Sequence, residues 1–380
     1  MAVSAHHAAI GMIFPPFLDH LRYSVSAIGT LASMGPILAL AARIPSGVVY
    51  RRGRTKPLMA AALAVIIACD LLYSFAVEPW ALALVHSLNG FAYGAATTFY
   101  LAFFVEALPP DEDRPHAMGY YSGSMAVGYS AGAYFAGWIT DRLGYPAAFQ
   151  LAASLAFIGL VMFFFLREVG AAPAQGASQR RGHSGVWLAL KSMADPNIAA
   201  LMTVALFLNL LFQMGHTFLP LYGLGVGLAL ADIGLIKGLY ALCNALTRPL
   251  GGPVVKRLGH QVVSRAGLPL QSAFMMLVPF FHDLGPLLVV FLMAGLLRAV
   301  VIVANTISMV EDVDESRMGR GMASGLFNAA GDLGAILGPS LGGWVASFTG
   351  VRDLFIVGPL LIVGAFFLTL WGCRFVGREK

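Results

Sequence analysis

The sequence predicts an all-α membrane protein with two homologous halves, and three observations lead to this fold class. Only 11% of the 380 residues are charged and 58% are hydrophobic, whereas a soluble domain carries about 25% charged residues. Apolar stretches of membrane-spanning length follow one another along the chain. Residues 132–149 recur as residues 338–355, with matching Gly, Trp and Phe spacings at an offset of 206. Such a repeat in so apolar a chain indicates two helix bundles, an architecture typical of transporters.

Twelve apolar stretches reach or approach the roughly 20 residues that a transmembrane helix needs. They cover residues 1–18, 25–49, 57–77, 79–107, 118–140, 146–167, 197–222, 231–253, 262–281, 284–310, 321–346 and 353–373. We therefore expect about 12 transmembrane helices in two six-helix bundles, residues 1–167 and 196–380, related by a pseudo-two-fold axis. The polar segment 168–195 is rich in Ala, Gly, Gln, Ser and Arg, so we expect it to be a cytoplasmic linker.

The first stretch is short compared with its partner in the second half. Pro15 aligns with Pro220 at an offset of 205, and the seventh stretch begins near residue 197. The first helix is therefore expected to begin about eight residues before Met1. We favour a truncated chain or a misassigned start site over a naturally short helix.

The distribution of cationic side chains predicts the orientation. If the loop 50–56 lies in the cytoplasm, 17 Lys and Arg residues fall on that side and 3 on the other, with 4 within the stretches. Cytoplasmic loops carry an excess of Lys and Arg. We therefore expect both termini in the cytoplasm, and we expect a multi-pass protein of a bacterial inner (plasma) membrane.

Local motifs agree with this two-half plan. The loop after the second stretch and its later copy carry Gly47, Arg51, Arg52, Gly53 and Arg54, then Gly252, Lys256, Arg257 and Gly259. The eleventh stretch carries Gly334, Gly338, Pro339, Gly342 and Gly343. These motifs resemble those of the major facilitator superfamily, the first its gate loop and the second its antiporter motif.

The resemblance implies a secondary active transporter that works by alternating access. Both gate loops lack the family's aspartate, whose position is held by Tyr50 or Arg51 in the first copy and by Lys256 in the second. The family usually places its antiporter motif in span five, where this chain has a weaker glycine ladder without the proline. The motif favours export, while the plainer interpretation is that these glycines let helices pack closely.

Two charged residues are expected near mid-depth on adjacent spans. Counting along antiparallel helices places Arg298 in span ten beside Asp332 in span eleven. A charge inside a bilayer is costly and usually faces a partner or a cavity. The two side chains are therefore expected to pair, either as a structural clasp or as a site where proton binding to Asp332 releases Arg298 for an anion.

Other polar residues recur on single helix faces. In span eight, Lys237, Tyr240, Asn244 and Arg248 share one face, which lines a cavity unless the two cations snorkel to opposite ends. In span seven, Asn209, Gln213 and His216 share a face that lines a cavity or joins helices by hydrogen bonds. His7 in span one is expected to mirror this wall.

Two further candidates lie in the first half. Asp70 in span three is either a proton-exchanging acid or a locally hydrogen-bonded group. His86 and Asn89 in span four belong to a segment that resembles a family pattern opening with arginine. His86 is either a titrating group near neutral pH or a structural hydrogen-bond partner.

The sequence lacks an ATP-binding loop of the Gly-x-x-x-x-Gly-Lys-Ser/Thr type, an HExxH motif and a Cys/His cluster with metal-ligand spacing. We therefore expect a monomeric transporter rather than an enzyme, with no cofactor, no metal and no nucleic-acid partner. Its partners are a small-molecule substrate, protons and the lipid bilayer.

The leading hypothesis is proton-coupled export, with Asp332, Asp70, His86 and His216 as coupling candidates. One alternative is proton-coupled uptake of an organic anion held by Arg298 and Lys237, and another is a non-transporting receptor on the same fold. An exporter of lipophilic compounds is expected to have a roomy aromatic cavity. An anion importer is expected to aim both cations at one ligand-sized void.

Overall fold

The computed structural model describes residues 1–50, 55–108, 114–166, 196–311 and 320–376. The regular elements in these ranges are all helices, so the predicted all-α fold is confirmed. The predicted linker 168–195 and the gate-loop residues Arg51, Arg52, Gly53 and Arg54 lie outside the described residues.

The first half contains six helices that follow the predicted stretches closely. They are α1 (Ala2–His20), α2 (Val25–Val49), α3 (Thr55–Leu72), α4 (Pro79–Ala107), α5 (Arg114–Leu143) and α6 (Tyr145–Phe165). Local chemistry sets several of the ends. The Ser24 hydroxyl caps α2 by accepting a hydrogen bond from the Ala27 N–H. Gly144, with a φ of 82°, makes the tight turn between α5 and α6.

The second half also follows the predicted order, with one break. It contains α8 (Pro196–Gly225), α9 (Leu230–Leu246), α10 (Arg248–Leu258), α11 (His260–Met276), η1 (Val278–Phe280), α12 (Leu284–Glu311), α13 (Arg320–Thr349) and α14 (Val351–Val376). The predicted stretch 231–253 is bent, because α9 and α10 meet at an angle of 59°. Pro249 near the start of α10 has no backbone N–H to continue the preceding helix.

Seven described helices are long and apolar enough by themselves to cross a membrane, or eight if α9 and α10 form one bent span. The remaining long helices, α1, α5, α11 and α13, complete the arrangement of about 12 spans. Helix α1 is buried along most of its length, and α5 and α13 pack between the halves. These helices therefore need less apolar surface than helices that face lipid.

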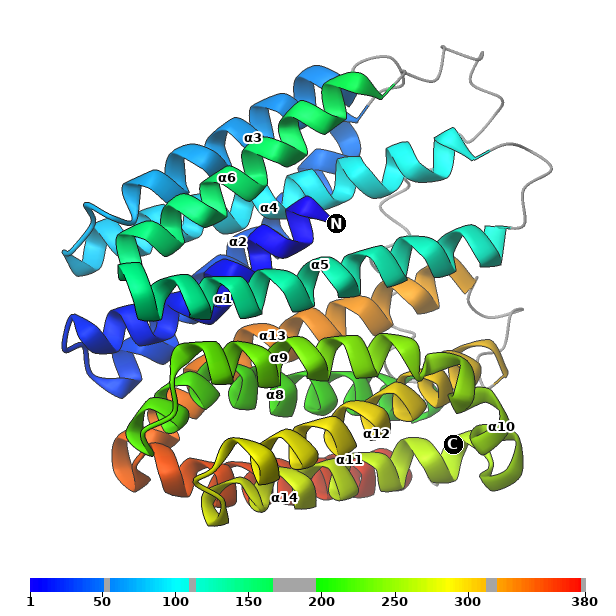
Figure 1. Cartoon of the computed structure of the whole chain (residues 1–380). Coiled ribbons are helices and arrows are strands. Elements are labelled where there is room, and N and C mark those ends of the chain that lie inside the picture. The colour runs from blue at the N-terminus through cyan, green and yellow to red at the C-terminus, as the bar shows by residue number, and fades with distance from the viewer. Residues whose placement is uncertain (51–54, 109–113, 167–195, 312–319, 377–380) are drawn as a thin grey trace.

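The two halves lie side by side (Figure 1), with α1–α6 in one group and α8–α14 in the other. Contacts between them are made mainly by α5 against α9 and by α2 against α13, with α1 touching α8. Glycines permit these close approaches. A Cβ added to Gly343 would lie 2.8 Å from the Val25 carbonyl oxygen and 3.0 Å from the Gly29 Cα.

The other glycines of the predicted antiporter motif pack within the second half. Added Cβ atoms at Gly338 and Gly342 would lie 2.9 Å from Gln213 and 2.8 Å from Met214, both on α8. Gly334 also faces the α8 backbone. The geometry therefore gives these glycines a packing role.

Short turns join the helices at one end of the bundle, at residues 21–24, 73–78, 144, 226–229, 277–283 and 350. We call this the hairpin end and the opposite end the linker end. At the hairpin end the Asp141 carboxylate of α5 accepts hydrogen bonds from the Leu230 N–H (3.0 Å) and the Ala231 N–H (2.7 Å) of α9. The acid thus caps the start of a helix in the other half, where the helix dipole favours negative charge.

The linker end carries the remaining predicted gate residues. Gly47 lies near the end of α2, while Gly252, Lys256 and Arg257 lie on α10. Gly259, with a φ of 84°, separates α10 from α11. An added Cβ at Gly47 or Gly252 would meet no other atom within 4 Å, so neither glycine is required by packing.

Candidate functional site

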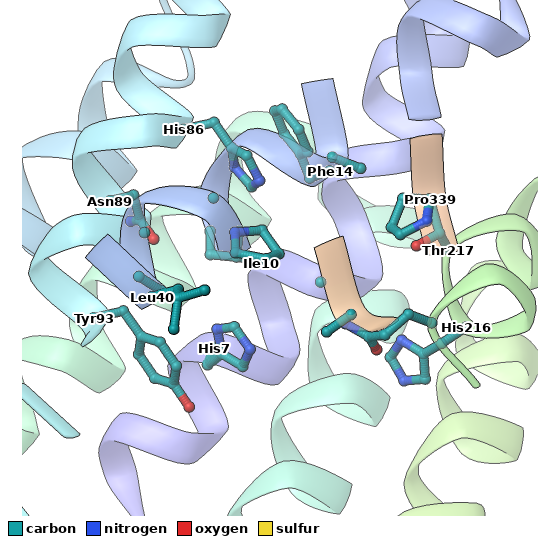
Figure 2. Close-up of a pocket in the computed structure, with 18 of the residues that line it drawn as sticks. His7, Ile10, Phe14, Leu40, His86, Asn89, Tyr93, His216, Thr217 and Pro339 are labelled. Atoms are coloured by element: carbon teal, nitrogen blue, oxygen red, sulfur yellow. The ribbon is translucent and has the colours of Figure 1, made fainter. Parts of the chain in front are cut away.

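A cavity of about 210 Å³ lies between the two halves. Helices α1, α2, α4 and α5 contribute its wall on one side, and α8 and α13 on the other. Much of its lining consists of aromatic and imidazole rings, those of His7, Phe14, His86, Tyr93, Tyr129 and His216. Figure 2 shows the labelled rings of His7, Phe14, His86, Tyr93 and His216 arranged around the space, with His7 and Tyr93 side by side.

Ring pairs build the first-half wall of this cavity. His7 stacks on Tyr93 with ring centroids 3.9 Å apart and 7° between the planes. Phe14 stacks on His86 with centroids 4.0 Å apart, again at 7°. The Tyr73 hydroxyl and His86 Nδ1 share a hydrogen bond of 2.7 Å, which fixes the imidazole. Such ordered rings suit flat, partly apolar ligands.

Half of the predicted cavity residues line this space. His7, His86, Asn89, Gln213 and His216 do so, as do Asp332 and Pro339 from the other predicted groups. The predicted residues Asn209, Lys237, Tyr240, Asn244 and Arg298 are not among the lining residues. Lys237 instead binds carbonyl oxygens in both halves, and the other four make polar or packing contacts within the second half.

Beneath the cavity, the first half holds a buried acid. Asp70 on α3 lies 2.9 Å from His6 Nδ1 on α1, and both side chains have an exposed fraction of 0%. The Asn89 amide of α4 donates a 2.9 Å hydrogen bond to the other Asp70 oxygen. Because Asn89 also lines the cavity, this acid is linked to the ligand space through one side chain.

His6 had no role in the sequence analysis. No sequence spacing links residue 6 to residue 70, because the contact forms only when α1 and α3 enter one bundle. The available signal was a pair of histidines early in an apolar stretch, since polar residues within a span are costly. Of these two, His7 faces the cavity and His6 faces Asp70.

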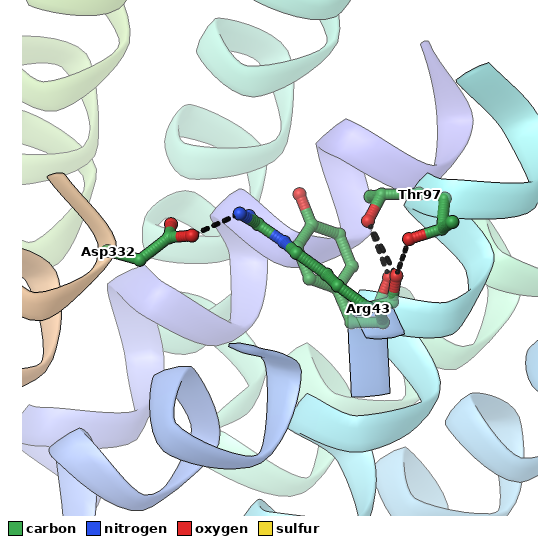
Figure 3. Close-up of polar contacts among 6 residues, drawn as sticks. Arg43, Thr97 and Asp332 are labelled. Carbon is green, nitrogen blue, oxygen red and sulfur yellow. Dashed lines mark hydrogen bonds and ion pairs between the residues drawn. The ribbon is translucent and has the colours of Figure 1, made fainter. Parts of the chain in front are cut away.

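The expected pairing of Arg298 with Asp332 is wrong. Asp332 forms its ion pair with Arg43 of α2 instead (Figure 3). Helix α13 packs mainly on α8 and α2 and only slightly on α12, so Asp332 faces α2. The exposed fractions are 48% for the Arg43 side chain and 24% for Asp332, so the pair lies at the rim of the cavity.

Arg298 is held within the second half. Its Nη1 donates to the Leu208 carbonyl oxygen and its Nη2 to the Asn209 Oδ1, each at 2.8 Å. The guanidinium lies over the Phe212 ring at 4.2 Å. These contacts join α12 to α8 and satisfy the cation through neutral acceptors and a π-face.

Lys237 is buried, with an exposed fraction of 1%, so the alternative in which it snorkels to a helix end is wrong. Its ammonium donates to the carbonyl oxygens of Gly11 (2.8 Å) and His216 (3.1 Å). Each carbonyl lies four residues before a proline, Pro15 or Pro220, which lacks the N–H that normally occupies it. One lysine thus fills two proline-freed carbonyls, one in each half.

The remaining polar residues of the α9 face join that helix to its neighbours. The Asn244 amide donates to the Gly295 carbonyl oxygen of α12 at 3.2 Å. Arg248 donates to the Asn244 Oδ1 at 3.3 Å across the break between α9 and α10. Tyr240 stacks on Phe212 with ring centroids 5.4 Å apart. The shared face predicted from the sequence is therefore a packing face.

A family profile described as Major Facilitator Superfamily matches residues 1–323 and 223–378. The chain belongs to the major facilitator superfamily. This confirms the resemblance inferred from the motifs, and members of this family are transporters rather than enzymes.

Two curated relatives match part of the chain. The quinolone resistance protein NorA of Staphylococcus aureus is 27% identical over 152 residues, which cover 40% of this chain and 38% of NorA. The multidrug resistance protein MdtG of a Rahnella species is 27% identical over 168 residues, 43% of this chain and 40% of MdtG. The matches therefore span about two fifths of these relatives' lengths.

Two solved structures share the fold. The nucleoside transporter NupG superposes with a TM-score of 0.80 at 15% identity, covering 100% of this chain and 98% of NupG. A bacterial homologue of the human lysosomal transporter Spinster, inward-facing and unoccupied, gives a TM-score of 0.79 at 15% identity, covering 100% of this chain and 95% of the other. At such identities the likeness shows the fold alone.

Proposed function

We propose that this transporter exports small amphipathic compounds in exchange for protons. The observation that carries the proposal is the ring-lined cavity between the halves, because aromatic and apolar walls bind lipophilic compounds. The partial sequence similarity to NorA and MdtG, both named for drug resistance, also supports export.

The placement of the cations argues against uptake of an organic anion. That function needs Lys237 and Arg298 aimed at one ligand-sized void, yet neither is among the residues that line the cavity. Both are bound to neutral acceptors in the protein. The cation in the lining is Arg43, and it is paired with Asp332.

Two observations support a cavity that opens to the cytoplasm: the distribution of Lys and Arg residues and the contacts between the halves. The cationic bias supports a cytoplasmic linker end. At the hairpin end the halves are joined by Asp141 of α5, which accepts hydrogen bonds from the start of α9. Further along α2, the Ser33 hydroxyl donates to the Ile336 carbonyl oxygen of α13 at 2.7 Å. The half-exposed Arg43 lies at the linker side of the cavity. The cavity then loads from the cytoplasm while the outer side is closed.

Asp70 is the proton-coupling group in this proposal, with His6 and Asn89 as its partners. A buried carboxylate is tolerated in a membrane only with a compensating positive charge or proton. A proton bound to Asp70 removes the negative charge, and the His6 ring lies 2.9 Å from the carboxylate as its partner. Removing the proton leaves a lone buried carboxylate, which is costly enough to favour a rearrangement of α1 against α3 and α4. Asn89 passes this change to the ligand space.

Asp332 is the acidic group in the cavity lining, and it bears on substrate choice. A cationic group on a substrate competes with Arg43 for the Asp332 carboxylate at the cavity rim. Together with stacked rings, which attract cations to their faces, this favours amphipathic cations over anions and sugars.

The experiment is proton flux in proteoliposomes of the full chain against a panel of amphipathic cations, organic anions and sugars. We expect protons to move opposite to an amphipathic cation. The Asp70→Asn variant keeps hydrogen bonding but not charge, so we expect it to lose proton movement and uphill transport while still equilibrating substrate.

Asp353→Asn is the matched control, because Asp353 is exposed in the first turn of α14. It is expected to transport like the parent protein. Proton movement in the same direction as the substrate, seen with anions alone and lost in Arg298→Ala, would establish the uptake alternative instead.

A further inference from the structure

A small void lies within the second half, apart from the ring-lined cavity. Its volume is about 10 Å³, and its polar lining consists of His216, Lys237, Tyr240 and Gln271. The surrounding walls are the rings of Phe212 and Phe291 and the thioether of Met275. Helices α8, α9, α11 and α12 meet here.

Polar groups in this lining have unused hydrogen-bonding capacity. Gln271 has an exposed fraction of 0% and Tyr240 of 4%. Neither the Gln271 amide nor the Tyr240 hydroxyl completes a hydrogen bond of normal geometry within the described part of the chain. The Lys237 ammonium has three donors and uses two, for Gly11 and His216. Buried polar groups in native proteins are nearly always satisfied, so these groups indicate an occupant.

The charge in this region indicates the sign of that occupant. The side-chain ion pairs in the described ranges are His6–Asp70 and Arg43–Asp332, and neither includes Lys237 or Arg298. Arg298 lies over Phe212, which is itself part of the void's wall. Two buried cations without a carboxylate partner create a positive potential that an anion relieves.

We propose that this void is a binding site for a single monatomic anion such as chloride, held by the Lys237 ammonium, the Tyr240 hydroxyl and the Gln271 amide. A void of this size accepts about one water-sized particle. A halide is larger than water, so the flexible Met275 side chain must move to admit it. A carboxylate or phosphate ligand is too large, which separates this site from organic-anion transport.

The site has a structural consequence that is independent of the direction of transport. An anion here neutralises the lysine that joins Gly11 of the first half to His216 of the second. Halide binding is therefore expected to stabilise the contact between halves.

The test is thermal unfolding of the full chain in lipid nanodiscs at constant ionic strength in chloride, bromide or gluconate. We expect Tm to rise saturably with chloride and bromide, but not with gluconate, which is too large to enter. A Tm that is the same in all three salts would overturn the proposal and leave the void to water.

Two variants test whether the halide-dependent rise in Tm arises at this void. Gln271→Glu places a fixed carboxylate beside Lys237, so we expect it to be stable in gluconate and to bind halide about tenfold more weakly or not at all. Lys237→Met is expected to lose the response as well. Arg248→Gln is the matched control, because Arg248 is an exposed cation outside the void, and it should keep the parent response.

A halide response that persists in Gln271→Glu would place the anion elsewhere and overturn the assignment. Crystals grown with bromide give an independent readout that does not depend on variants. Anomalous scattering from bromide between Lys237 and Gln271 is expected, and an ordered water without that signal would contradict the proposal.

Discussion

The two halves treat buried charge in opposite ways. In the first half a carboxylate, Asp70, is compensated by His6 and hydrogen-bonded by Asn89, which lines the cavity. In the second half the cations Lys237 and Arg298 are bound to carbonyl and amide oxygens and are absent from the cavity lining described here. The first arrangement pairs an acid with an imidazole and is the site proposed for proton coupling, whereas the second holds helices together.

What repeats between the halves is backbone geometry rather than polar chemistry. Pro15 and Pro220 occupy equivalent positions, and so do the carbonyls of Gly11 and His216 that they free. Lys237 has no second copy, yet it binds both carbonyls. The repeat thus supplies two identical acceptors, and one unrepeated residue joins them. This contact ties α1 to α8 and α9, so it must change when the halves move apart.

The largest expected effect on stability distinguishes the structural cation Arg298 from Asp70, the acid proposed for proton coupling. Arg298→Met removes charge-assisted hydrogen bonds to Leu208 and Asn209, so we expect a loss of roughly 2 kcal/mol in unfolding free energy. Proton coupling should persist in the protein that remains folded. Denaturant unfolding and proteoliposome flux measure the two properties separately.

Arg352→Met is the control for this comparison. Arg352 also donates to a carbonyl oxygen, that of Pro279 at 3.2 Å, but it lies exposed at the hairpin end. We expect a change below about 0.5 kcal/mol, as for most surface substitutions. Loss of coupling in a stable Arg298→Met protein would show that the second half also carries the proton, and the contrast between halves would fail.

The success of the sequence-based predictions depended on how local each signal was. The helices follow from length and hydropathy, so the predicted stretch 79–107 coincides with α4. Gln213 and His216 were found because a shared helix face is a local pattern, and α8 turns that face toward the cavity. The bend at Thr247 was missed, although Pro249 two residues later is a known signal for the end of a helix.

Contacts between helices could not be derived from one sequence. Arg298 and Asp332 were placed at similar depth, but pairing depends on which helices touch, and α13 faces α2 and α8. The same reason explains why His6 was overlooked and why the α9 face was taken as a candidate cavity wall. Depth along a helix is readable from residue numbers, whereas rotation about the helix axis and the choice of neighbours arise from packing.

A smaller effect is expected at the hairpin end, where the halves meet through Asp141. Asp141→Ala removes the carboxylate that caps α9 from the other half, and loss of a cap costs about 1 kcal/mol. Because this contact crosses the interface, the cost should appear as easier opening of the hairpin end. Cysteine cross-linking between the start of α9 and the end of α5 should become less efficient.

Asp232→Asn supplies the matched control on the same helix. Asp232 lies in the first turn of α9, where its negative charge interacts favourably with the helix dipole. The cap that crosses the interface, however, comes from Asp141. Its replacement should leave cross-linking nearly unchanged. Equal effects in the two variants would mean that Asp141 stabilises α9 alone and does not join the halves.

The smallest effect on stability is expected at the Arg43–Asp332 pair, the one described side-chain ion pair that joins the two halves. Because both side chains are partly exposed at the cavity rim, the pair contributes about 0–1 kcal/mol. Its removal by Arg43→Gln should therefore change selectivity more than stability. With Asp332 left uncompensated, we expect tighter binding of cationic substrates, measured by competition against a neutral analogue.

The swapped variant Arg43→Asp with Asp332→Arg tests whether the pair or the position matters. If the pair only joins α2 to α13, the swap restores the parent preference. If Asp332 itself contacts substrate, the swap preserves stability but reverses the charge preference, and Asp332 is then a substrate contact in its own right.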